Sequence, residues 1–127
     1  MKKIIASAKK AVEAAKASTE RVELAEGMAF ETNKYGPNRS IESLDMLAKT
    51  FLGLTSDIQD IGFDIDIAVG KLEYALAGDD RGGAYHDDMA SLLDELEGLK
   101  PENASLRERA LALFFEFNSL SSIKMAS

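Results

Sequence analysis

The chain contains no cysteine and only one histidine among its 127 residues. Without cysteine it forms no disulfide and no thiolate metal site, which favours a reducing compartment. With one histidine and ordinary serines, no nucleophilic triad can be nominated. No segment approaches the roughly 18 uncharged apolar residues of a membrane span, and Lys9 and Lys10 interrupt the apolar start before it is long enough for a secretory leader. We expect a cytoplasmic protein with no membrane partner and no cofactor.

What the chain has instead is a long helical pattern. Apolar and small residues from Ile41 to Leu76 alternate at spacings of three and four residues, a heptad pattern that keeps its phase throughout. They are Ile41, Leu44, Ala48, Phe51, Thr55, Ile58, Gly62, Ile65, Val69, Leu72 and Leu76. A second row recurs every seventh residue beside this seam, so the stripe is wide enough for a bundle core. The pattern predicts one helix over 41–77, about 54 Å long, although a break at Gly53 would give two shorter helices.

Three further helices are predicted around this one. Heptad spacing of mostly alanine predicts a helix over 2–33, which a glycine and a proline end. A third helix over 85–99 stops at Pro101, and a capping box of Ser105 and Glu108 begins a fourth over 106–120. Short loops make sequential helices antiparallel. We therefore expect an all-α, up-down antiparallel bundle of about four helices with one long central helix, in a single domain over 1–127.

Charge is distributed unevenly along the chain. The Lys/Ala-rich residues 1–18 have a net charge of +4, whereas residues 57–97 have a net charge of −10. The alanines of this first segment bury little area, so it either packs very closely on a neighbour or lies partly exposed until a partner covers it. The acidic field repels phosphate backbones and attracts basic surfaces. We therefore expect a protein partner with a basic surface and no direct nucleic-acid binding, although solubility alone also explains acidic surfaces.

The central helix carries two sets of residues that its buried seam does not need. The first set is an acidic face that consists of Asp57, Asp60, Asp64, Asp66 and Glu73. Like charges at this spacing cost an isolated helix a few tenths of a kcal/mol per pair, which a basic partner would offset. The second set is apolar and consists of Met46, Phe63, Ile67 and Tyr74. Packing in the core of a four-helix bundle is the leading explanation of the apolar set, and an interface with another subunit or partner is the alternative.

These features favour a binding protein over an enzyme. In the first hypothesis the chain is an adaptor, regulator or inhibitor whose acidic side chains steer a basic partner and whose apolar side chains hold it. A rod of spaced carboxylates can imitate the charge of a nucleic-acid backbone. Small phage-encoded inhibitors of bacterial defence enzymes often use this kind of imitation. By this analogy, the partner would be a larger protein that binds nucleic acid. In a second hypothesis the chain is a structural homo-oligomer with no client.

Two pairs of carboxylates support an enzymatic alternative. Glu23 and Glu26 lie three residues apart on the first predicted helix, and Glu42 and Asp45 have the same spacing on the second. Two antiparallel helices could converge such carboxylates on a magnesium ion and a diphosphate. These two four-residue motifs resemble the E-x-x-E and E-x-x-D signature of the MazG-like all-α nucleoside triphosphate pyrophosphohydrolases. The resemblance implies magnesium-dependent release of pyrophosphate, whereas helix capping explains the second pair without a metal.

A further group of carboxylates surrounds the histidine. Its members are Asp79, Asp80, His86, Asp87 and Asp88. Oxygen ligands in a glycine-rich loop could hold Ca²⁺ or Mg²⁺, but the spacing does not match the calcium loop that places ligands at alternate positions. Solvation of a loop and favourable charge at a helix start explain the same residues.

Overall fold

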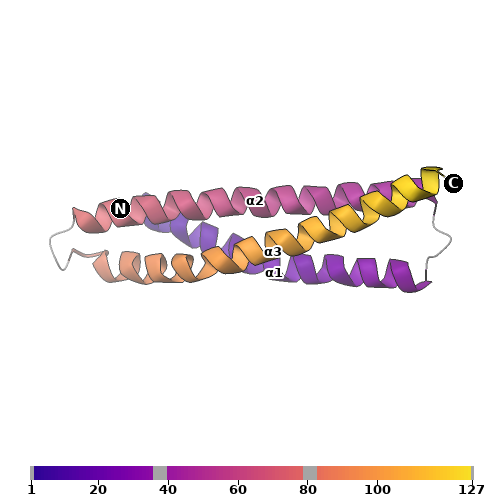
Figure 1. The fold of residues 1–127 in the computed structure, drawn as a ribbon. Helices are drawn as coiled ribbons and strands as arrows, with labels where there is room; N and C mark the ends of the chain where they lie inside the picture. The colour runs from indigo at the N-terminus through magenta and orange to yellow at the C-terminus, as the bar shows by residue number, and fades with distance from the viewer. Residues whose placement is uncertain (1, 36–39, 79–82, 127) are drawn as a thin grey trace.

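The computed structural model describes residues 2–35, 40–78 and 83–126. Within these ranges it contains three helices, α1 (Lys2–Tyr35), α2 (Ile41–Ala77) and α3 (His86–Ala126), and no strand. Figure 1 shows an elongated bundle in which α2 runs antiparallel to α1 and α3. The all-α antiparallel bundle is therefore confirmed, with three helices instead of four. No helix in the described part of the chain is long and apolar enough to cross a membrane.

The long helix α2 has the bounds that its sequence pattern predicts. The side-chain oxygen of Ser40 accepts a hydrogen bond from the backbone N–H of Ser43 at 3.1 Å and caps the start of the helix. The helix continues through Gly53 without a break. Its seam is buried, and Phe51 and Ile58 are both fully enclosed. Glycines inside α2 reduce the stability of the helix, and burial of the seam offsets this loss.

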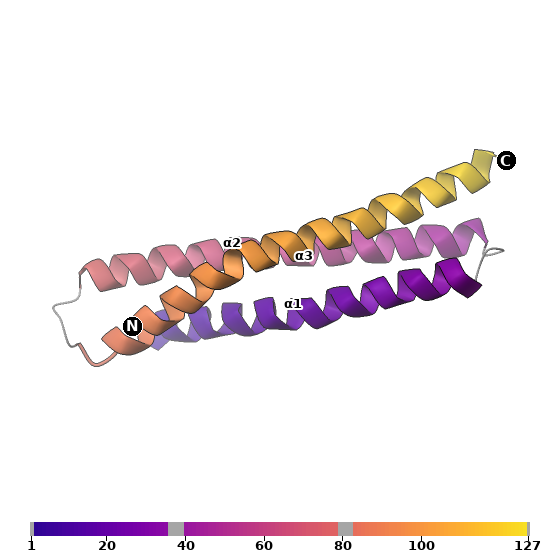
Figure 2. The ribbon, with the colours of Figure 1, turned by 60° about the horizontal axis from the view of Figure 1, so that its bottom comes forward.

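The predicted break between a third and a fourth helix is wrong. The helix α3 continues through Pro101, and Ser105 and Glu108 lie inside it instead of at a helix start. A proline inside a helix costs about 3 kcal/mol, because it removes a hydrogen bond and its ring clashes with the preceding turn. Burial of Leu96 before the proline and Leu106 after it offsets this cost. Figure 2 shows α3 changing direction in its orange middle stretch, as expected for a helix that contains proline.

The core consists of two hydrophobic clusters, one in each half of the bundle. In the first, Ala8, Ala11 and Ala15 of α1 are at most 6% exposed, so the alanine-rich segment packs closely on its neighbours. In the second, the rings of Phe51 and Phe117 meet edge to face with centroids 5.3 Å apart. The first cluster therefore combines alanines of α1 with larger aliphatic side chains, whereas the two fully buried aromatic rings lie in the second.

A polar layer of Ser18 and Asn103 lies between the two clusters, and Thr55 lies within the second cluster; all three residues are buried. Ser18 and Thr55 donate hydrogen bonds to carbonyls one turn earlier on their own helices, at 3.0 and 2.8 Å. Asn103 donates to the carbonyl of Ile58 at 3.1 Å, while its Oδ1 has no hydrogen-bond partner among the described residues. Sliding α3 along α2 would break the bond of Asn103 and bury its amide against apolar side chains, so this residue favours one lengthwise alignment.

Candidate protein-binding surface

The fold places the basic start of α1 against part of the acidic surface. The ammonium of Lys16 lies 2.7 Å from a carboxylate oxygen of Glu95 on α3. On the other flank, Lys10 of α1 and Asp64 of α2 line one hollow between their helices. The N-terminal helix therefore neutralises part of the negative charge of residues 57–97.

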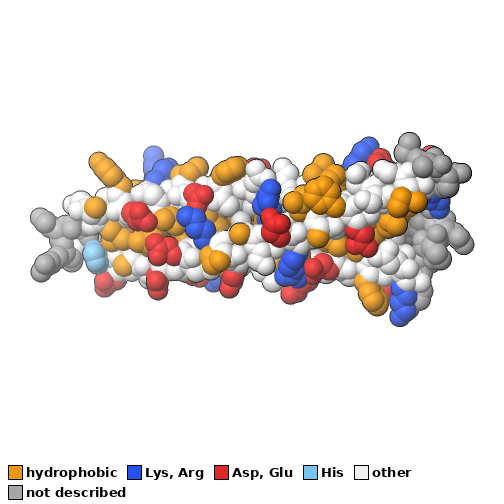
Figure 3. Space-filling model, viewed as in Figure 1, with side chains coloured by type: hydrophobic (Ala, Val, Ile, Leu, Met, Phe, Trp, Pro, Cys, Tyr) orange, Lys and Arg blue, Asp and Glu red, His pale blue; other side chains and the backbone are white. Residues whose placement is uncertain are grey.

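The flank of α2 beside α3 keeps more of its negative charge. Here Nζ of Lys100 lies 2.8 Å from Oδ1 of Asp66. The hydrogen bond to Asp66 raises the pKa of Lys100, and the charges of Asp66, Glu73 and Glu97 add to this shift. One ammonium group thus pairs with one carboxylate, and the charges of two more carboxylates act on it. Figure 3 shows acidic side chains along the whole length of this face, with basic side chains among them.

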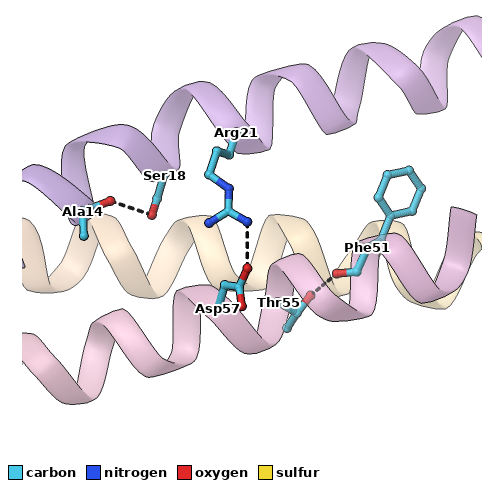
Figure 4. Close-up of polar contacts among 6 residues, drawn as sticks. All are labelled: Ala14, Ser18, Arg21, Phe51, Thr55 and Asp57. Atoms are coloured by element: carbon cyan, nitrogen blue, oxygen red, sulfur yellow. Dashed lines mark hydrogen bonds and ion pairs between the residues drawn. The ribbon is translucent and has the colours of Figure 1, made fainter.

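The predicted acidic face divides into paired and unpaired residues. Oδ2 of Asp57 accepts a hydrogen bond from Nη2 of Arg21 at 2.7 Å, and Figure 4 shows this contact between α1 and α2. Asp66 is paired with Lys100, as described above. The members that form no ion pair within the described part of the chain are Asp60, Asp64 and Glu73. The unpaired carboxylates are the ones that a partner could bind without breaking a contact of the chain.

Three of the four predicted apolar residues line the outward side of α2. Phe63 and Ile67 are each 55% exposed, and Tyr74 is 85% exposed. With Gly70 they follow spacings of four, three and four residues, which is a second heptad pattern on the side away from the buried seam. We call Phe63, Ile67, Gly70 and Tyr74 the outer seam. Met46 is also exposed but lies roughly 25 Å away along the helix axis.

The outer seam is exposed because the bundle has three helices. The helix α2 buries its inner seam against α1 and α3, and a further helix would be needed to cover the opposite side. Elsewhere in the part of the chain whose side chains are described, the exposed large hydrophobic residues are Leu24, Met28, Phe30, Leu52, Phe115 and Ile123. Among these exposed residues, the outer seam is distinguished by its alignment along one helix over about three turns.

The first carboxylate pair of the enzymatic hypothesis faces an arginine. The guanidinium of Arg109 on α3 donates two hydrogen bonds to Glu26, one of them from Nε to Oε2 at 3.0 Å. These bonds lower the pKa of Glu26. Glu23 is close enough that its charge contributes to the raised pKa of Arg109. An ion pair between α1 and α3 therefore accounts for this E-x-x-E word.

The second carboxylate pair has its own local contacts. Glu42 lies in the first turn of α2, where the helix dipole favours an anion. Asp45 forms an ion pair with Lys49 one turn later, at 3.0 Å. Across the residues that the structure describes, no three histidine or carboxylate side chains come together in a group that could hold a metal. The structure thus does not bring Glu23, Glu26, Glu42 and Asp45 to a common metal position.

The residues around the histidine take up ordinary positions at a helix start. His86 begins α3, and Asp87 and Asp88 lie in its first turn, where acidic side chains are favourable. Asp79 and Asp80 of the same group lie outside the described residues.

Sequence reasoning missed the basic residues that pair with the candidate carboxylates. These residues are Arg21, Lys100 and Arg109. Each lies beside the buried seam of its helix, which is a signal that it can reach a neighbouring helix. The lengthwise alignment of the helices decides which acid it meets, and a heptad pattern alone does not give that alignment.

Lowering the pH should remove the stabilisation that Glu26 provides. Because Arg109 holds the pKa of Glu26 below its ordinary value of 4.5, the unfolded chain binds this proton more readily than the folded chain. The contribution is thus present above pH 4.5 and is lost as the pH falls through the lowered value. In urea titrations, the free energy of unfolding should decline less steeply between about pH 5 and pH 3 for Glu26→Gln than for the wild type. Parallel declines would show that the ion pair does not contribute.

No protein-family model matches the sequence, and no curated protein or solved structure matches it either. The candidate surface is therefore assigned from the geometry of the described residues. It presents apolar side chains beside carboxylates, an arrangement that can bind a partner. Among the described residues, the groups with a shifted pKa are Glu26, Lys100 and Arg109, and all three are held in ion pairs between helices.

Proposed function

We propose that the chain is a protein-binding module that acts as an adaptor, regulator or inhibitor of a larger protein with a basic surface. The observation that carries this proposal is the outer seam, where Phe63, Ile67 and Tyr74 are more than half exposed along one helix. Aligned exposed hydrophobic residues beside charged ones are typical of protein interfaces. The position of the seam on a long, continuous helix also supports the proposal, because a rigid element holds binding residues in a fixed arrangement.

The proposed mechanism has an electrostatic part and an apolar part. The unpaired Asp60 and Glu73, with the carboxylates around Lys100, attract a basic surface and speed the encounter. Burial of the three large seam side chains then holds the complex, and complete burial contributes about 1.5–3 kcal/mol for each such side chain. Exposed charges are screened over about 10 Å at 0.1 M salt, so the electrostatic part is the one that depends on ionic strength.

The kinetics of binding test this mechanism. The partner is isolated from an extract of the source cell on immobilised chain, identified by mass spectrometry and purified, and its binding is followed by surface plasmon resonance. We expect the association rate to fall about tenfold between roughly 50 and 500 mM salt, while the dissociation rate changes little. An association rate that is independent of salt would contradict the proposed steering.

A matched pair of variants locates the steering charges. Asp60→Asn combined with Glu73→Gln removes two unpaired charges beside the outer seam and should slow association several-fold. The control, Glu20→Gln combined with Glu31→Gln, removes the same charge from the exposed side of α1 and should have a smaller effect. Equal slowing by both pairs would mean that net charge, and not the face around the outer seam, directs the encounter.

A further inference from the structure

We infer that the partner docks on the outer seam as an amphipathic α-helix that carries basic residues along the edge next to α3. The docked helix packs lengthwise on α2 and covers the side that the three-helix bundle leaves open. This inference rests on the proposed function and specifies the chemistry of the partner.

The spacing of the outer seam selects a helix as the bound element. Phe63, Ile67, Gly70 and Tyr74 form a straight row about 16 Å long, with a mean separation of about 5 Å along the axis. A second helix presents side chains at the same separation, so its apolar residues can interdigitate with the whole row. An extended strand repeats its side chains on one face about every 7 Å, which does not match.

Gly70 provides room for close approach of the docked helix. A glycine inside a helix costs about 1 kcal/mol relative to alanine. A Cβ added to Gly70 would have no atom within 4 Å, so contacts inside the described chain do not require glycine at this position. Because Ile67 and Tyr74 flank it, the missing side chain leaves a gap in the row that a large apolar side chain of the docked helix can fill.

The edge of the outer seam next to α3 is acidic. Asp66 forms an ion pair with Lys100 there at 2.8 Å, and the charges of Glu73 and Glu97 add to the raised pKa of that lysine, so three carboxylates share one ammonium group. A lysine or arginine on the docked helix would therefore meet an excess of negative charge along this edge. Flanking charges of this kind set partner choice and orientation in coiled coils.

The charges along the edge next to α1 are nearly balanced. Ile67 of the seam lines a hollow between α1 and α2 together with Asp64, Lys10 and Lys71. Asp60 lies four residues before Asp64 on the same flank of α2, so two carboxylates accompany two ammonium groups there. A cation of the docked helix is therefore attracted less at this edge than at the edge next to α3, and this difference places the basic side of the docked helix next to α3.

The test uses a synthetic helical peptide of three heptads as the probe. It has leucine at its seam positions, lysine along one edge and alanine or glutamine elsewhere, and a matched probe has glutamate in place of lysine. Fluorescence anisotropy measures the binding of both probes to the full chain. We expect the lysine probe to bind about tenfold or more tightly than the glutamate probe. Equal affinities would overturn the assignment of a basic helix.

Two glycine variants locate the docking site on the chain. A Cβ meets nothing within 4 Å at either Gly70 or Gly98, so Gly70→Glu and Gly98→Glu should both keep the fold, which circular dichroism checks. Gly70→Glu fills the gap in the outer seam and should weaken binding of the lysine probe about tenfold or more, whereas Gly98→Glu on α3 should leave it unchanged. Equal effects of the two variants would overturn the inference.

The same preparations separate this inference from the proposed function. If the lysine probe fails to bind while the isolated partner still shows salt-dependent association, the helical docking mode is wrong and the protein-binding role stands. If light scattering shows a dimer of the chain alone that dissociates in Gly70→Glu, the seam belongs to a second copy and the inference is overturned.

Discussion

Replacing Phe51 with alanine should lower the free energy of unfolding by about 3–5 kcal/mol. The ring is fully buried in the second core cluster and meets Phe117 edge to face, so its loss removes apolar burial, the ring contact and the filling of a cavity. Urea unfolding followed by circular dichroism measures the change. The control is Phe115→Ala, because Phe115 is 56% exposed on the same helix as Phe117 and should cost well under half as much. Similar losses at both positions would contradict the described core.

Replacing four helix glycines with alanine should raise the free energy of unfolding by about 3 kcal/mol in total. The positions are Gly27, Gly53, Gly70 and Gly98, where an added Cβ has no atom within 4 Å. Each alanine removes the entropic cost of a glycine inside a helix without forcing any neighbour to move. A combined variant with a gain below about 1 kcal/mol would show that these segments are not regular, solvent-facing helix.

Gly62 provides the contrast to these four positions. A Cβ there would lie 3.1 Å from Nδ2 of Asn103, which is held in the polar layer by its bond to the carbonyl of Ile58. Gly62→Ala should therefore gain less than an average member of the set, or lose stability. Gly70→Ala should also weaken binding, because the gap in the outer seam would be partly filled. The four-glycine variant would thus gain stability at the expense of the proposed function.

The sequence was sufficient where local pattern determines the structure. The bounds of α2 follow from its heptad pattern and its Ser40 cap, and the buried positions of Phe51, Ile58 and Ile65 follow from their places in that pattern. These features depend on one helix alone, so spacing and capping chemistry predict them.

The sequence was insufficient to predict features that depend on contacts between helices. Pro101 is a strong local signal for a helix end, but burial on both sides of it keeps α3 continuous. The sequence predicts Asp57 as a residue that binds a partner, whereas the alignment of α1 places Arg21 in an ion pair with it. The E-x-x-E word of Glu23 and Glu26 is matched by Arg109, which is 83 residues from Glu26 in the chain. Ion pairs between residues so far apart in the chain depend on the order and alignment of the helices, which a four-residue motif does not contain.

The loss of the predicted fourth helix changes the interpretation of the apolar residues on α2. A fourth helix of the same chain would have covered them, and core packing would have explained them. With three helices the outer seam lies on the surface, beside carboxylates that form no ion pair within the described ranges. We therefore propose that a helix of the partner covers this side of α2.

The most direct measurement compares the affinity of the purified partner for Ile67→Glu and for Phe115→Glu. The two side chains are 55% and 56% exposed, so both variants add one charge to an apolar surface position, but only Ile67 belongs to the outer seam. We expect Ile67→Glu to raise the dissociation constant about tenfold or more and Phe115→Glu to leave it within about twofold. An unchanged constant for Ile67→Glu, or equal weakening by both variants, would contradict binding at the outer seam.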